Sequence, residues 1–107
     1  MKLGIIRCKQ TEDGCPGTGD FRAARAKTGA FEGVEGEIEI IGFASCGGCC
    51  GKKAVSRAGE MVKRGATAIA FSTCMSKGSY PCPFVRQIKD AVRVKLGEEV
   101  RVFDFTH

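Results

Sequence analysis

Residues 38–65 read IEIIGFASCGGCCGKKAVSRAGEMVKRG. The first seven residues are nearly all apolar, which is typical of a buried strand. From about Cys50 onward, apolar residues recur at the spacing of one helix face. These apolar residues are Ala54, Val55, Ala58, Met61 and Val62. The pattern therefore predicts a strand, a tight turn over Ser45–Lys53 and an amphipathic helix, which is the repeating unit of an α/β fold.

The same alternation continues on both sides of this stretch. Further strand patterns cover Lys2–Cys8, Thr67–Thr73 and Glu99–Phe105, with Phe103 or Phe105 facing inward on the last of them. A helix is predicted after Asp20, which is a good N-cap, with Phe31 as a candidate for its buried face. Met75–Pro81 is predicted to be a loop, and another helix begins at Pro83 and ends at Gly97. The element order βαβαβαβ predicts a single three-layer α/β domain over residues 1–107. We expect a Rossmann- or flavodoxin-like four-stranded parallel sheet in the order 2-1-3-4.

Composition narrows the class of protein. The chain has 107 residues, seven of them cysteine, and 17 Lys+Arg against 12 Asp+Glu give a formal charge of +5. The basic residues mostly alternate with apolar ones at helical spacing, so we expect solvated helix faces and no nucleic-acid partner. No apolar run is long enough for a membrane span, and a strand pattern follows directly on Met1. These features predict a cytoplasmic protein without a signal peptide or membrane partner.

The cysteines are placed unevenly in the predicted fold. Loops that follow parallel strands open on one edge of the sheet, where α/β proteins bind ligands. All seven thiols and the single histidine fall at or after strand ends, and none lies in a helix body. They are Cys8, Cys15, Cys46, Cys49, Cys50, Cys74, Cys82 and His107. In a reducing cytoplasm such clustering favours metal binding or thiol chemistry over disulfides.

The turn Cys46-Gly47-Gly48-Cys49 carries the strongest local signal. Two thiols three positions apart can converge on one point, and the glycines can adopt positive φ and turn their N–H groups toward sulfur. The helix that follows favours thiolate over thiol at its N-terminus. These properties suit a pair of metal ligands or a redox pair.

At this point the chain resembles the CGGC-domain proteins, small prokaryotic domains regarded as metal-binding. The resemblance covers nearly the whole length, and it rests on several separate motifs. These are Gly4-Ile5-Ile6-Arg7-Cys8, Cys15-Pro16-Gly17, Gly29-Ala30-Phe31, Gly42-Phe43, Cys46-Gly47-Gly48-Cys49, Arg64-Gly65-Ala66, Ser72-Thr73-Cys74, Pro81-Cys82-Pro83-Phe84 and Thr106-His107. Three positions depart from the family pattern: Asp20 replaces a frequent Cys, Cys50 a Pro, and Phe105 a Gly.

The resemblance implies a metal site drawn from these Cys and His positions, and four interpretations stay open. The first is a zinc site of Cys8, Cys46, Cys49 and Cys74, in which Cys82 or His107 can replace a ligand and Cys15 is a further candidate. The second is an iron–sulfur cluster on the same thiols. The third is a thiol-redox enzyme that uses the Cys-Gly-Gly-Cys pair. The fourth is a metal-delivery module for a partner protein. The sequence identifies neither a small-molecule substrate nor a protein partner.

Overall fold

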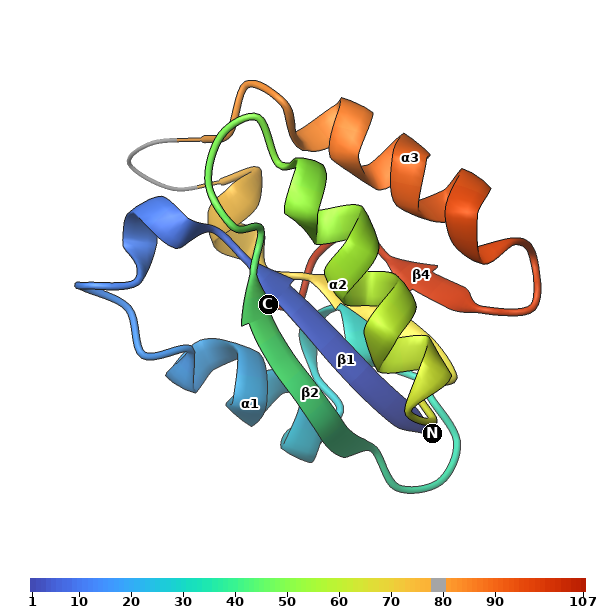
Figure 1. Cartoon of the computed structure of the whole chain (residues 1–107). Coiled ribbons are helices and arrows are strands. Elements are labelled where there is room, and N and C mark those ends of the chain that lie inside the picture. The colour runs from blue at the N-terminus through green and yellow to red at the C-terminus, as the bar shows by residue number, and fades with distance from the viewer. Residues whose placement is uncertain (78–80) are drawn as a thin grey trace.

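The computed structural model describes residues 1–77 and 81–107. Four parallel strands form one sheet in the order β2-β1-β3-β4, which confirms the predicted fold class and strand order. The strands are β1 (Lys2–Arg7), β2 (Glu39–Ser45), β3 (Ala68–Phe71) and β4 (Arg101–Phe103). The helices are α1 (Thr18–Ala26), α2 (Lys52–Lys63) and α3 (Val85–Leu96), drawn in Figure 1.

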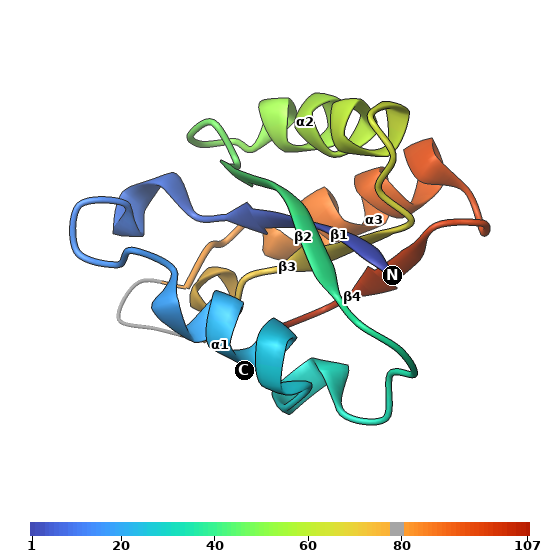
Figure 2. The ribbon, with the colours of Figure 1, turned by 90° about the horizontal axis from the view of Figure 1, so that it is seen from below.

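The sheet lies between two helical layers. Figure 2 shows α2 and α3 on one face and α1 on the other. On the α2/α3 face, Ile6, Ile69 and Phe71 pack against Ala54, Ala58, Met61, Ile88 and Val92. On the α1 face, Leu3, Ile5, Ala68, Ala70 and Phe103 pack against Ala23, Ala24, Phe31 and Val34. Side chains of alternate strand residues therefore feed two separate cores, as a sheet covered on both faces requires.

Two glycines let α2 approach the sheet closely. A Cβ atom on Gly4 would lie 2.5 Å from Met61 Sδ, and one on Gly42 would lie 3.0 Å from Met61 Cγ. Gly4 and Gly42 are paired across β1 and β2. Met61 therefore rests directly on the backbone of two neighbouring strands, and this contact fixes the height of α2 above the sheet.

Several local predictions were wrong in detail. Asp20 is not the N-cap of α1: the N-cap is Gly17, three residues earlier and in the left-handed conformation, and the side chain of Asp20 is buried. Phe31 lies in the 3-10 turn Gly29–Phe31 beyond α1, although it is buried as expected. The sequence left Phe103 and Phe105 open as the inward aromatic residue of the last strand; the inward residue is Phe103, whereas Phe105 is 44% exposed. At Asp20 the difference arises because long-range hydrogen bonds to buried hydroxyls outweigh its local capping propensity.

Several further boundaries differ: α3 begins at Val85 and not at Pro83, and β4 covers only Arg101–Phe103. Helix α2 begins at Lys52, two residues after the predicted start at Cys50. The predicted loop Met75–Pro81 begins inside a 3-10 turn, Thr73–Met75, and residues 78–80 of that loop lie outside the described part of the chain. No helix among the described residues is long and apolar enough to cross a membrane.

Candidate metal centre

The carboxyl edge of the sheet holds the loops that follow β1, β2 and β3 side by side. The backbone N–H of Cys46 donates to Arg7 O at 2.7 Å, and the N–H of Ser72 donates to Ile6 O at 2.8 Å. These bonds extend the strand pairing by one residue past each strand end. They bring Cys8, the next residue after β1, beside the start of both neighbouring loops.

Four cysteines line one cavity at this edge. Cys8, Cys46, Cys49 and Cys82 form parts of its wall, and its volume is about 340 Å³. Cys8 and Cys46 are buried, Cys82 is half-buried and Cys49 is exposed. All seven cysteines lie in the described part of the chain, and each is a free thiol. The fold thus brings together thiols that are 74 residues apart in sequence.

The Cys-Gly-Gly-Cys turn has the backbone that its glycines predict. Gly47 and Gly48 have φ values of 80° and 104°. The N–H of Gly47 donates to the Ser45 hydroxyl at 3.1 Å, so it does not face sulfur as expected. The Arg57 guanidinium donates to the backbone carbonyl and to the hydroxyl of Ser45, both at 3.0 Å. Arg57 therefore anchors Ser45, the residue before the turn, to the side of α2, while Gly48 lines the cavity.

The surroundings of the Cys8 thiol raise its pKa. Burial raises the pKa of Cys8 above the ordinary value of 9.0, and the neighbouring Cys46 and Cys74 thiols add to the rise. The backbone N–H groups of Gln10 and Thr11 act in the opposite direction. A buried thiol beside two other thiols resists carrying a negative charge by itself. A bound cation would remove that obstacle, because it compensates the charge of the thiolates.

Cys74 makes a different set of contacts. Its thiol donates to the Ser72 hydroxyl at 3.3 Å and accepts from the Thr11 hydroxyl at 3.5 Å. Thr11 also donates to Cys8 O at 3.0 Å. Cys74 packs against the same apolar cluster as Cys8, but it is not part of the cavity wall. Cys82 therefore lines the cavity with the other three thiols, whereas Cys74 lies beside Cys8 but outside the cavity wall.

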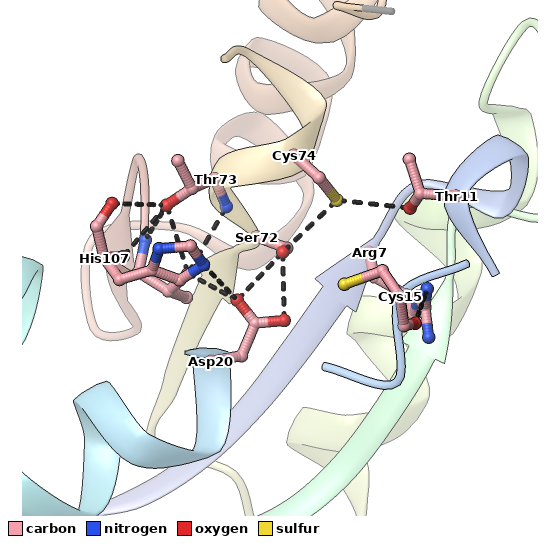
Figure 3. Close-up of polar contacts among 9 residues, drawn as sticks. Arg7, Thr11, Cys15, Asp20, Ser72, Thr73, Cys74 and His107 are labelled. Atoms are coloured by element: carbon pink, nitrogen blue, oxygen red, sulfur yellow. Dashed lines mark hydrogen bonds and ion pairs between the residues drawn. The ribbon is translucent and has the colours of Figure 1, made fainter. Parts of the chain in front are cut away.

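A buried carboxylate continues the chain of contacts behind Cys74. The Ser72 hydroxyl donates to Asp20 at 2.9 Å and 3.0 Å, and the Thr106 hydroxyl donates to Asp20 Oδ1. Asp20, Ser72 and Thr106 are each at most 2% exposed. His107 Nε2 lies 3.9 Å from Asp20 Oδ1. Figure 3 shows this network, which joins α1, the end of β3 and the segment after β4.

The remaining predicted ligands lie away from the cavity. His107 is next to Asp20, with its imidazole about half exposed. The carbonyl of Cys15 accepts a hydrogen bond from the buried Arg7 guanidinium, and in the view of Figure 3 the Cys15 thiol points toward Ser72 and Cys74. Cys50 is exposed and lines a separate hollow between α2 and α3.

The donor chemistry of the cavity fits a thiophilic metal, because four thiols and no carboxylate line it in the described residues. Thiolates are the ligands that zinc, copper(I) and iron–sulfur clusters share. However, no three Cys, His, Asp or Glu side chains within residues 1–77 and 81–107 are already close enough together to hold one ion. The thiols surround a space instead of meeting at a point.

Sequence reasoning missed the network around Asp20. Its only signal in the sequence was that Asp20 departs from the family pattern. Ser72 and Thr106 gave no signal, because a Ser or Thr after a strand is usually an ordinary loop residue. From the sequence, Arg7 beside Cys8 could either screen thiolate charge or point away from it. In the structure Arg7 is buried, its guanidinium lies 5.4 Å from the centre of the Phe43 ring, and its Nε has no hydrogen-bond partner among the described residues.

Comparison with known proteins identifies the family of the chain. A family model described as the CGGC domain matches residues 2–107. The chain is also similar to the uncharacterized protein MJ0582 of Methanocaldococcus jannaschii, with 36% identity over 109 residues, 95% of this chain and 81% of the relative. No solved structure matches. The chain therefore belongs to the CGGC domain family.

Proposed function

We propose that this protein binds a thiophilic metal ion, zinc in the first instance, in the cavity at the carboxyl edge of its sheet. The observation that carries the proposal is the shared cavity wall of Cys8, Cys46, Cys49 and Cys82. These thiols come from three separate loops, and family membership favours metal binding. Seven free thiols suit a reducing compartment, so the proposal places the protein in the cytoplasm.

The ligand set we propose contains Cys82 where the sequence suggested Cys74. Cys82 lines the cavity, and its backbone N–H donates to Met75 O at 2.8 Å. This hydrogen bond connects the Cys82 loop to the 3-10 turn that follows β3. The proton of Cys74 is directed to Ser72, and a buried carboxylate lies behind that hydroxyl. A thiolate at Cys74 would therefore face Asp20 across one hydroxyl group. We assign His107 to the Asp20 network because its imidazole lies next to that carboxylate.

An iron–sulfur cluster is the second candidate, and the size of the cavity favours it. Four cysteine thiolates are the usual ligands of both [2Fe–2S] and [4Fe–4S] clusters. A cluster is larger than one ion, so it suits thiols that surround a space of about 340 Å³ without converging. Zinc would require the thiols to move closer, to Zn–S distances of about 2.3 Å.

The test is the metal and acid-labile sulfide content of protein isolated under anaerobic conditions. About one zinc per chain without sulfide supports the first candidate, whereas iron with equimolar sulfide and visible absorption identifies the second. The variants Cys8→Ser and Cys46→Ser should each lose most of the bound metal. Cys50→Ser is the matched control, because Cys50 is exposed and outside the cavity. Wild-type protein without stoichiometric metal, or a Cys8→Ser variant that keeps it, would contradict the proposal.

A further inference from the structure

Two cysteines that are not part of the cavity wall, Cys15 and Cys74, come from loops that are joined through Thr11. Both are half-buried free thiols. The backbone N–H of Cys15 donates to Thr11 O at 2.8 Å. The hydroxyl of Thr11 lies 3.5 Å from Cys74 Sγ. One residue is therefore within hydrogen-bond distance of both cysteines, and it holds the two loops beside each other.

A second connection between the two loops runs through the end of β1. The Arg7 guanidinium donates to the backbone carbonyl of Cys15. The carbonyl of Ile6, the residue before Arg7, accepts from the N–H of Ser72 at 2.8 Å, and the Ser72 hydroxyl lies 3.3 Å from Cys74 Sγ. In Figure 3 the Cys15 thiol points toward Ser72 and Cys74. The two thiols therefore face the same small region of the carboxyl edge.

The hydrogen bonds around Cys74 form a route for its proton. The Cys74 thiol donates to the Ser72 hydroxyl, and that hydroxyl donates to the Asp20 carboxylate at 2.9 Å and 3.0 Å. Asp20 and Ser72 are each 2% exposed, so this route is shielded from water. When the Cys74 sulfur forms a new covalent bond, Ser72 can take its proton and pass its own to Asp20. This arrangement suits Cys74 to a reaction in which it loses a proton.

From these contacts we infer that Cys15 and Cys74 are a redox-active pair that reacts with small disulfides, separately from the metal cavity. Cys15 first loses its proton to solvent and attacks a disulfide R–S–S–R, which gives a mixed disulfide and a thiolate that takes a proton from solvent. The sulfur of Cys74 then attacks the sulfur of Cys15, and its proton passes through Ser72 to Asp20. The second R–S group leaves as a thiolate, and the proton on Asp20 returns to it through solvent. Two protein thiols are thereby oxidised to one disulfide, and the small disulfide is reduced to two thiols. Transient disulfides of this kind occur in reducing compartments.

The experiment is peptide mapping, because trypsin separates these two cysteines from all the others. Residues 10–22 carry Cys15 as their single cysteine, and residues 65–77 carry Cys74. The reduced full chain is incubated with glutathione disulfide, quenched with N-ethylmaleimide, digested without reductant and analysed by mass spectrometry. We expect the two peptides to be joined by a disulfide, at a mass lower than their sum by two hydrogen atoms.

Single serine variants test the order of the two steps. Cys74→Ser should lose the linked peptides and accumulate a glutathione adduct on residues 10–22, because the resolving thiol is absent. Cys15→Ser should also lose the linked peptides, but with little adduct on residues 65–77. Cys50→Ser is the matched control: Cys50 is exposed and lies outside this pair, so the linked peptides should remain. Equal adduct on the two single variants would overturn the order of the steps.

The role of Ser72 as a positioning residue is tested by the rate of the second step. Ser72→Ala should slow conversion of the mixed disulfide to the linked pair by about tenfold or more at neutral pH, because the route to Asp20 is interrupted. The difference from wild type should shrink as the pH rises, since hydroxide then takes the proton directly. An equal rate in the folded variant at neutral pH would overturn this route.

The remaining outcomes separate the inference from the proposed function. A glutathione adduct that persists on Cys15 in wild type, or a disulfide between Cys15 and a cysteine other than Cys74, overturns the inference. So does a wild-type protein in which neither cysteine reacts. Bound zinc is measured in the same samples. A linked pair in protein without zinc supports the inference and contradicts the metal proposal alone.

Discussion

Replacement of Asp20 by alanine should cost more stability than the loss of any exposed acidic residue at this edge. Asp20 accepts hydrogen bonds from the hydroxyls of Ser72 and Thr106, both of which are buried. A hydrogen bond to a charged group contributes about 1.5–3 kcal/mol, and each buried donor left without a partner is itself costly. Two such bonds sum to about 3–6 kcal/mol. Removal of the carboxylate also removes its own desolvation penalty, so we expect a loss of about 3 kcal/mol.

This loss is a large part of the free energy of unfolding, which is about 5–15 kcal/mol for a domain. The assay is urea unfolding followed by circular dichroism, with chelator and reductant present so that metal binding does not contribute. With a urea dependence of about 1.5 kcal/mol per molar, the midpoint should fall by about 2 M. Asp13→Ala is the matched control: Asp13 is an exposed aspartate of the preceding loop, and its loss should change stability by less than about 0.5 kcal/mol.

A double-mutant cycle separates the network from a general effect of the substitution. Because Ser72 donates to Asp20, Ser72→Ala should cost at least about 1 kcal/mol less in the Asp20→Ala background than in wild type. If the two costs simply add, the hydroxyl and the carboxylate do not act together. If Asp20→Ala unfolds at the wild-type midpoint, the reasoning about the buried network is refuted.

Three further predictions follow from the same structure. In metal-free protein, the raised pKa of Cys8 favours its thiol form in the folded state. The stabilisation that the thiol form contributes is complete below pH 9.0 and is lost as the pH rises through the folded-state pKa. The free energy of unfolding should therefore fall more steeply above pH 9 in wild type than in Cys8→Ala. Gly29→Ala should destabilise the fold by more than about 2 kcal/mol, because the φ of Gly29 is 58° and an added Cβ atom would overlap Thr106 O. The control Gly36→Ala should cost only about 1 kcal/mol, because Gly36 has a φ of 77° but open space around it. Equal midpoints in urea would contradict this reasoning. Metal affinity should fall as the pH drops, because binding displaces thiol protons, and a chelator should raise the number of thiols that react with a colorimetric reagent; an unchanged thiol count would remove the cysteines from the ligand set.

The order of elements and the edge of the sheet that carries the cysteines could be predicted from the sequence. Apolar residues at a helical period in α2, and an almost wholly apolar β3, are local patterns that a single chain displays directly. Because parallel strands share one direction, every loop that follows a strand then lies on one edge of the sheet. The order of the residues alone therefore assigns Cys8, Cys46 and Cys82 to one region of the molecule.

Only the tertiary structure decided which of these residues line one cavity. A position at the carboxyl edge does not tell how deeply a side chain is buried or which way it points. The sequence therefore could not separate Cys82, which lines the cavity, from Cys74, whose thiol donates to Ser72. Local propensity predicts an N-cap role for Asp20, but its actual partners, Ser72 and Thr106, are 52 and 86 residues away. Such long-range contacts are set by packing between layers, which leaves no periodic trace in the chain.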